Sequence, residues 1–264
     1  MNSLLAFDTA TEHLSIAVAA HDRVLTHEPA GGAQASATLI PAILALLARA
    51  GVRLCDLDAI AFGRGPGAFT GLRTACAVAQ GLAYGAGKPV LAIDTLLAVA
   101  EDARGAAPEL DVWVAMDARM DEVYAAHYRF EAGAWSVLDA PMLTTPDVLN
   151  ARWRAQPPMC VAGSALAAFE DRLAAGDARR MPDALPRAAA MLPLARALWA
   201  QGGAVDAAHA LPLYLRDKVA QTIVERDAVR AAKEALHGPS AGPLQAGPHP
   251  RGGATVVPGG RGTP

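Results

Sequence analysis

The chain's 264 residues are enough for one large domain or two modest ones, and its 53% hydrophobic fraction is enough for a substantial core. Aromatic residues make up only 5% of the chain, so the core must consist mainly of aliphatic side chains. The 23 Lys and Arg against 26 Asp and Glu give a net charge of −3, which argues against a general attraction to nucleic acid or to an anionic membrane.

Targeting and redox features indicate a cytoplasmic protein. The N-terminus has no basic region of the kind that opens a signal peptide, and the apolar runs 39–48 and 90–100 are too short, or are interrupted by Asp94, for a membrane span. The cysteines are odd in number and show no CxxC spacing; they are Cys55, Cys76 and Cys160. We expect them to be buried, reduced thiols.

The first half begins as a meander of three short strands. Alternating and apolar patterns predict these strands at 4–7, 14–19 and 24–27, with a polar loop at 8–12 between the first two. The elements predicted next are a helix at about 36–50, a strand at 59–62, a helix at 74–84, a strand at 90–93 and a short helix at 95–104. This order is typical of an α/β protein with a mixed sheet.

The second half starts again with a strand, 112–116, that again ends at an aspartate, Asp117. The elements predicted next are hairpin strands at 123–128 and 135–138, a helix at 146–153, a strand at 159–162 and helices at 165–174 and 187–201. The pattern of 211–216 predicts no conformation. Residues 219–236 have helical composition, and about half of residues 237–264 are Gly or Pro, so we expect a disordered tail there.

A corner rich in Gly and Pro joins the strand at 59–62 to the next helix. Its structural residues are Gly65, Pro66, Gly67, Thr70, Gly71 and Arg73. The glycines and the proline restrict the backbone to a tight turn. Thr70 is a candidate N-cap, and Gly71 leaves the first helical turn open to a close approach. The pattern suits either a small anion at the helix start or packing against another backbone segment.

Both halves thus begin with a strand, an aspartate and a hairpin, and this layout resembles the actin-like ATPase superfamily (ASKHA, ribonuclease H-like fold). The resemblance implies an α/β fold of two duplicated mixed-sheet subdomains, the second one reduced. We expect these subdomains at 1–106 and 107–218, followed by a C-terminal helix at 219–236 and the tail at 237–264.

Three segments carry a more specific likeness: 5–12 (LAFDTATE), 65–73 (GPGAFTGLR) and 116–124 (MDARMDEVY). Residues 213–216 (LYLR) agree with it as well. Together these segments resemble the bacterial TsaB (YeaZ-type) family, over roughly residues 1–225. The resemblance implies a non-catalytic scaffold or activator needed to make N6-threonylcarbamoyladenosine at position 37 of ANN-decoding tRNAs.

The same resemblance implies the partners. The chain is expected to form a heterodimer with the catalytic paralogue TsaD, to help recruit the ATPase TsaE and to form a homodimer in isolation. It is expected to meet tRNA only through the complex. No tightly bound cofactor is expected, although ATP or ADP could lie at the junction with the partner subunits.

A vestigial nucleotide site is the second implication. Its candidate residues are Asp8, Thr9, Thr11, Asp117 and Arg119. The loop after Asp117 lacks the glycine with which an active member approaches phosphate, and Gly163-Ser164 is a thin remnant of an adenosine-binding turn. Two plainer roles stay open: Asp8 as a cap of its own loop, and Arg119 in a local salt bridge with Asp121 or Glu122.

The histidines argue against a helical metal site. The catalytic paralogue holds a metal through an HxxxH pair, and none of the seven histidines here lies four residues from another. We therefore expect no metal site.

The two helices at 36–50 and 74–84 are apolar over more than one packing face, and the second carries a strip of small residues. We expect them to build a four-helix interface with TsaD. The candidate interface residues are Leu39, Ile43, Leu47, Phe69, Leu72, Ala75, Val78, Ala79 and Leu82. The alternative is that these faces are core, packed against the chain's own sheet.

Two other functional classes stay open. One is an active enzyme of the same fold, either a small-molecule kinase using Asp8 and Asp117 or a metallopeptidase. The other is a module that binds tRNA directly, which the near-neutral charge disfavours.

Overall fold

The computed structural model describes residues 3–29 and 35–216. The helix expected at 219–236 and the tail expected at 237–264 lie outside the described residues. Within the described part of the chain, no helix is both long and apolar enough to cross a membrane.

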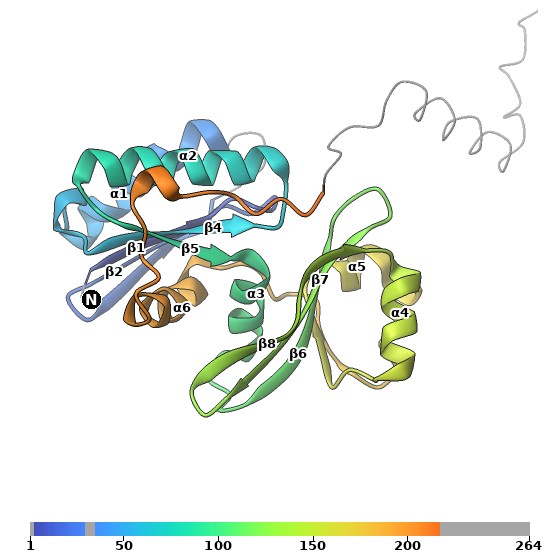
Figure 1. Cartoon of the computed structure of the whole chain (residues 1–264). Helices are drawn as coiled ribbons and strands as arrows, with labels where there is room; N and C mark the ends of the chain where they lie inside the picture. The colour runs from blue at the N-terminus through green and yellow to red at the C-terminus, as the bar shows by residue number, and fades with distance from the viewer. Residues whose placement is uncertain (1–2, 30–34, 217–264) are drawn as a thin grey trace, which may run out of the picture. The chain divides into compact units, whose positions relative to one another are not determined.

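The first half forms a five-stranded mixed sheet in the order β3-β2-β1-β4-β5 (Figure 1). β1 pairs antiparallel with β2 and parallel with β4, and β5 extends the parallel side. The strands are β1 (Leu4–Asp8), β2 (Ser15–Ala20), β3 (Arg23–His27), β4 (Ala59–Gly65) and β5 (Val90–Asp94). The predicted meander and the two later strands are confirmed.

The second half repeats this topology. β6 pairs antiparallel with β7 and parallel with β9, so the order β10-β9-β6-β7-β8 reads the same as the first sheet in reverse. Its strands are β6 (Leu110–Asp117), β7 (Val123–Glu131), β8 (Ala134–Thr144), β9 (Cys160–Ala162) and β10 (Arg179–Met181). The duplicated mixed-sheet fold is confirmed, although the short strand β10 was not predicted.

Helices cover both faces of the first sheet. α1 (Ala35–Ala50) and α2 (Phe69–Ala86) pack on one face with Phe7, Ile16 and Phe62. α3 (Thr95–Arg104) and α6 (Ala188–Ala200) pack on the other, where the strands present mostly Ala and Leu. Figure 1 shows the two pairs on opposite sides of the sheet. Alanines on the strands let α6 approach closely, which explains how a chain with few aromatics fills its core.

The second sheet lies between two further clusters. α3 also packs against it, through Leu96, Val99 and Ala103. Its other face is covered by α4 (Pro146–Ala155) and α5 (Ala165–Phe169), which meet Trp113 and Val161. Short 3-10 turns lie at Leu54–Asp56, Glu170–Arg172 and Ala207–His209.

The chain returns to the first sheet after the second is complete. α6 lies inside the predicted second subdomain, 107–218, yet it packs on β1, β2 and β5. Residues 207–216 then run along α2, where Gln80 Nε2 donates to the carbonyl of Ala210 at 2.9 Å. α6 thus follows the second sheet in the sequence but packs on the first.

Two local expectations were wrong. α2 begins at Phe69 with Ala68 as its N-cap, so Thr70 lies inside the helix and caps nothing. Cys76 and Cys160 are buried thiols, but Cys55 is exposed in the 3-10 turn before β4.

Candidate functional site

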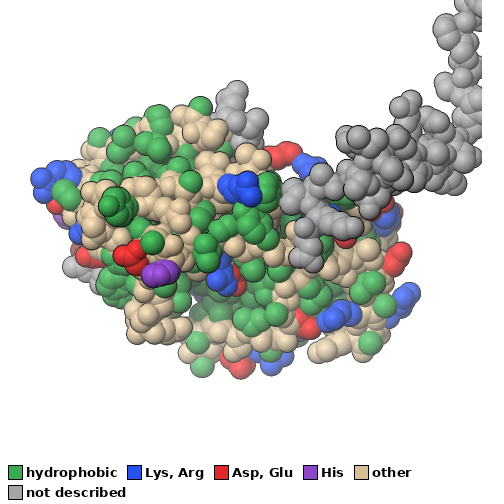
Figure 2. Space-filling model, turned by 45° about the horizontal axis from the view of Figure 1, so that its top comes forward, with side chains coloured by type: hydrophobic (Ala, Val, Ile, Leu, Met, Phe, Trp, Pro, Cys, Tyr) green, Lys and Arg blue, Asp and Glu red, His purple; other side chains and the backbone are tan. Residues whose placement is uncertain are grey.

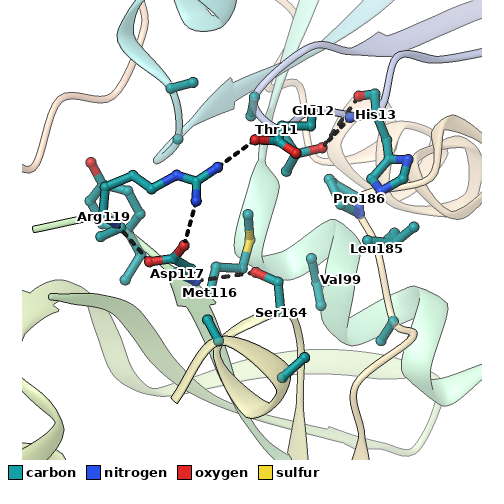
Figure 3. Close-up of a pocket in the computed structure, with 18 residues that line it drawn as sticks. Thr11, Glu12, His13, Val99, Met116, Asp117, Arg119, Ser164, Leu185 and Pro186 are labelled. Atoms are coloured by element: carbon teal, nitrogen blue, oxygen red, sulfur yellow. Dashed lines mark hydrogen bonds and ion pairs between the residues drawn. The ribbon is translucent and has the colours of Figure 1, made fainter. Parts of the chain in front are cut away.

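A cavity of about 510 Å³ lies where the two halves meet. The loop after β1 and the corner before α2 contribute one side of it, and the end of β6 and α5 contribute the other (Figure 3). Of the five predicted nucleotide-site residues, Thr11, Asp117 and Arg119 line this cavity. Asp8 and Thr9 do not line it.

Asp8 is instead fully buried at the end of β1. Its Oδ1 accepts the backbone N–H of Ala10 at 2.7 Å, and its Oδ2 accepts the hydroxyl of Thr95 at 2.9 Å. Burial raises the pKa of the Asp8 carboxyl from 3.8 to about 6, against the opposing effect of these two hydrogen bonds. Asp8 therefore caps its own loop, the plainer of the two roles considered for it.

The Gly/Pro corner packs against this loop. The Ala68 N–H donates to the Ala10 carbonyl at 2.8 Å, and the Thr9 hydroxyl donates to the Gly71 carbonyl at 2.7 Å. A Cβ on Gly71 would lie 1.9 Å from the Thr9 carbonyl oxygen, and one on Gly67 would lie 2.6 Å from the backbone oxygen of Ala10. Of the two uses considered for the corner, the structure has the backbone packing.

The other structural residues of the corner meet the C-terminal segment. Gly65 has φ +111°, and a Cβ there would lie 2.8 Å from the carbonyl oxygen of Leu213. The N–H of Leu213 donates to the backbone carbonyl of Arg64. The Arg73 guanidinium lies 3.9 Å from the centroid of the Phe69 ring, and its Nε donates to the Tyr214 hydroxyl at 3.2 Å. The shape of this corner thus depends on residues 213 and 214, for which the sequence predicted no conformation.

On the opposite side of the cavity, β6 ends in a left-handed turn. The backbone φ values of Arg119, Met120 and Asp121 are 61°, 56° and 60°. Residues other than glycine rarely adopt this left-handed conformation. Arg216 supports the turn from the C-terminal segment, since it pairs with Glu122 and donates to the Ala118 carbonyl at 2.9 Å.

This turn directs Arg119 across the mouth of the cavity. Its guanidinium pairs with Glu12 of the first half and, at 3.2 Å, with Asp117, as Figure 3 shows. The local salt bridge expected with Asp121 or Glu122 was wrong, because those carboxylates pair with Arg172 and Arg216. The Asp117 N–H is itself satisfied by the Ser164 hydroxyl at 3.1 Å.

The predicted interface residues lie mostly in the chain's own core. Six of the nine are at most 3% exposed: Leu39, Ile43, Leu47, Leu72, Ala75 and Ala79. All of them except Leu72 belong to the cluster under α1 and α2. Val78 and Leu82 are partly buried against the same cluster, and Phe69 is half-buried beside Tyr214. For the six buried residues, the alternative that they are core is therefore correct.

The exposed apolar side chains of these helices are different ones. Ile40 and Leu44 on α1 are 41% and 49% exposed, and Tyr84 on α2 is 86% exposed. Figure 2 turns this helical face toward the reader, and hydrophobic side chains and uncharged groups dominate it. The two helices contain only two charged residues, Arg49 and Arg73.

Sequence reasoning did not assign Glu12, Met116 and Tyr124 to the cavity that they line. These residues were quoted as parts of motifs, but nothing in one sequence indicates that they face the same space. Ser164, expected as part of the remnant of an adenosine-binding turn, does line the cavity. Among residues 3–29 and 35–216, no group of three or more His, Cys, Asp and Glu side chains is placed to hold a metal ion.

Comparisons with known proteins indicate the family of the chain. Residues 19–224 match the family model described as TsaD, tRNA N6-adenosine threonylcarbamoyltransferase. The tRNA threonylcarbamoyladenosine biosynthesis protein TsaB of Escherichia coli is 36% identical over 82% of this chain and 96% of its own length. The protein of the same name from Haemophilus influenzae is 34% identical over 82% of this chain and 94% of its own length.

A solved structure gives the same result. The structure of YeaZ from Pseudomonas aeruginosa superposes with a TM-score of 0.74 at 39% identity, covering 81% of this chain and all of that one. Sequence and structure together place the chain in the TsaB (YeaZ-type) family.

Proposed function

We propose that the chain is a non-catalytic scaffold and activator in the N6-threonylcarbamoylation of adenosine 37 in ANN-decoding tRNAs. Its membership of the TsaB family supports a role in tRNA threonylcarbamoyladenosine biosynthesis, because the names of its relatives state that role. In this proposal the chain forms a heterodimer with TsaD and helps to recruit the ATPase TsaE.

The observation that carries the proposal is the uncharged face of α1 and α2. Ile40, Leu44 and Tyr84 expose apolar surface there, and only Arg49 and Arg73 carry charge in either helix. Charged side chains make up 19% of the whole chain, so this face is poor in the groups that keep a surface in water. Depletion of charge together with exposed aromatic and aliphatic side chains is typical of a protein–protein interface.

The non-catalytic part of the proposal is supported by the state of Asp8. Its two carboxyl oxygens accept hydrogen bonds from Ala10 and Thr95, and the side chain has no exposed surface. An actin-like kinase would need this carboxylate beside a metal and phosphate. The proposal includes no tightly bound cofactor, with ATP or ADP only at the junction with partner subunits.

The remaining partners follow from the same reasoning. In the absence of TsaD the apolar helical face would pair with a second copy of the chain, giving a homodimer. With a net charge of −3 the chain would meet tRNA through the complex rather than by its own affinity. The proposal places this activity in the cytoplasm and away from membranes.

Reconstitution tests the function. The cognate TsaD, TsaE and donor-forming enzyme would be mixed with tRNA, threonine, bicarbonate and ATP, with and without this chain. We expect modification to be lost when the chain is omitted, and to be restored equally by wild type and by Asp8→Asn. Unchanged modification without the chain, or ATP hydrolysis by the chain alone that Asp8→Asn abolishes, would instead support an active enzyme.

A pair of variants tests the interface. Leu44→Arg places a charge at a 49% exposed position on α1, and Val148→Arg makes the same kind of change at a 52% exposed position on α4. We expect Leu44→Arg to weaken co-purification with TsaD by at least about ten-fold, because a desolvated charge costs several kcal/mol at an interface. Val148→Arg should bind normally. Equal binding by both folded variants would place the interface elsewhere.

A further inference from the structure

The scaffold role does not explain what the cavity between the two halves binds. The residues that line the cavity do not fit the metal-bound nucleotide that the fold implies. We infer that this cavity takes a neutral, phosphate-free ligand with a flat ring, of the class of a purine nucleoside, and does not bind a metal–nucleoside triphosphate.

Five of the backbone donors that line the cavity already have acceptors. On the first-half side, the N–H of Ala10 donates to Asp8 and that of Ala68 donates to Ala10. On the second-half side, the N–H of Asp117 donates to Ser164. The next two are also satisfied, since Ala118 donates to the Glu122 carbonyl and Arg119 to Asp117 Oδ1. A phosphate would have to displace these bonds.

The two aspartates that would hold a cation are likewise engaged. Asp8 Oδ2 lies against the backbone of Gly63, where a Cβ would come within 1.7 Å of it, so no ion fits on that side. Asp117 accepts the Arg119 N–H through Oδ1 at 2.8 Å and pairs with the Arg119 guanidinium through Oδ2 at 3.2 Å. A divalent cation at Asp117 would therefore have to displace a guanidinium.

Charge at the rim also disfavours an anion. Of the side chains that line the cavity, Glu12 and Asp117 are acidic and Arg119 is basic, while His13 and Tyr124 are the other titratable groups. Arg119 is held by both carboxylates, so its positive charge is balanced before a ligand arrives. A triphosphate would meet one guanidinium that already has two partners.

What remains is an apolar slot of the right size. At about 510 Å³ the cavity falls in the range of small-molecule sites, roughly 300–1,000 Å³. Val99, Met116, Tyr124, Ala184 and Pro186 are among the apolar and aromatic residues that line it. An aromatic ring, a thioether and a proline ring are surfaces against which a flat heterocycle packs well. The small side chains of Ala167 and Ala168 on α5 leave the space open.

The test is calorimetric titration of the isolated chain with adenosine, guanosine, AMP and Mg·ATP as separate probes. We expect at least one nucleoside to bind, and each added phosphate to lower the affinity. The affinity for Mg·ATP should be at least about ten-fold lower than that for the nucleoside. Mg·ATP binding as tightly as the nucleoside, or no binding of either nucleoside at millimolar concentration, would overturn the inference.

Two variants locate the site. Ala168→Phe adds a ring at an exposed helical position that lines the cavity, and Ala151→Phe adds the same ring at an exposed position on α4, which does not line it. We expect nucleoside binding to be lost in Ala168→Phe and kept in Ala151→Phe, with unchanged melting temperatures. Nucleoside binding that survives Ala168→Phe would contradict the assignment to this cavity.

Discussion

Replacing Asp8 by Asn should make the protein more stable at neutral pH, although Asp8 lies in a motif that identifies the family. Burial raises the pKa of this carboxyl from 3.8 to about 6. At neutral pH, ionising Asp8 therefore costs free energy in the native state that it does not cost in the unfolded chain. The two-unit shift corresponds to about 3 kcal/mol of stability, at about 1.4 kcal/mol per unit. Asp8 has no exposed surface, so solvent screening does not reduce this figure.

The direction with pH follows from the raised pKa. Below about pH 3.8 both states bind the proton and the cost is absent; it grows as pH rises and is complete above about pH 6. Asn cannot ionise and keeps the shape of the side chain. Its Oδ1 can still accept the Ala10 N–H, and its amide can donate to the Thr95 hydroxyl oxygen.

Urea denaturation of both proteins at about pH 5, 6, 7 and 8 measures the effect. We expect the free energy of unfolding of Asp8→Asn to exceed that of wild type by about 3 kcal/mol at pH 7 and by about half of that at pH 5. Asp22→Asn is the control: it removes an exposed carboxylate at the turn between β2 and β3, and should change stability by less than about 0.5 kcal/mol. A stability difference that does not vary with pH, or an Asp8→Asn protein that is weaker at pH 8, would refute the reasoning.

Two further predictions concern backbone geometry and are measured by thermal unfolding. Gly71→Ala should cost about 3 kcal/mol or more, because its Cβ would lie 1.9 Å from the Thr9 carbonyl oxygen, whereas Gly81→Ala in the same helix has nothing within 4 Å and should add about 0.5–1 kcal/mol. Similar melting temperatures for these two would contradict the close packing. Ala132→Asn should raise stability by about 0.5 kcal/mol, since Ala132 (φ 50°) and Gly133 (φ 81°) form a two-residue hairpin turn that favours Asn-Gly. A lower melting temperature would count against that turn type.

Periodicity and turn residues were enough to predict the duplicated sheets, because strands β1 to β9 are apolar or alternating over several residues. β10 was not predicted because it is a three-residue strand, Arg179–Met181, without such a pattern. The interface residues were misassigned for a different reason. On α1 the buried Leu39 and Ile43 and the exposed Ile40 and Leu44 are adjacent stripes of the same chemistry, so periodicity cannot say which stripe faces the sheet.

The sequence placed Thr11, Asp117 and Arg119 in one site, but it could not predict the contacts around the cavity that join distant residues. Arg119 meets Glu12 across 107 positions, and Arg216 meets Ala118 across 98. Local patterns describe Glu12, Arg119 and Arg216 as ordinary surface charges, and only the fold brings them to these partners.

The return of α6 to the first sheet has a consequence for how the protein is made. One face of that sheet, with Leu4, Ala6 and Ala61, is covered by Met191 and Ala195 of α6, which the ribosome adds after the whole second sheet. At synthesis rates of about 5–20 residues per second, the nascent first half must wait several seconds with that face incomplete. A fragment ending near residue 106 should therefore aggregate, and a chaperone that holds apolar strands would find its substrate in this interval. The second half is, in this sense, an insertion that delays the completion of the first.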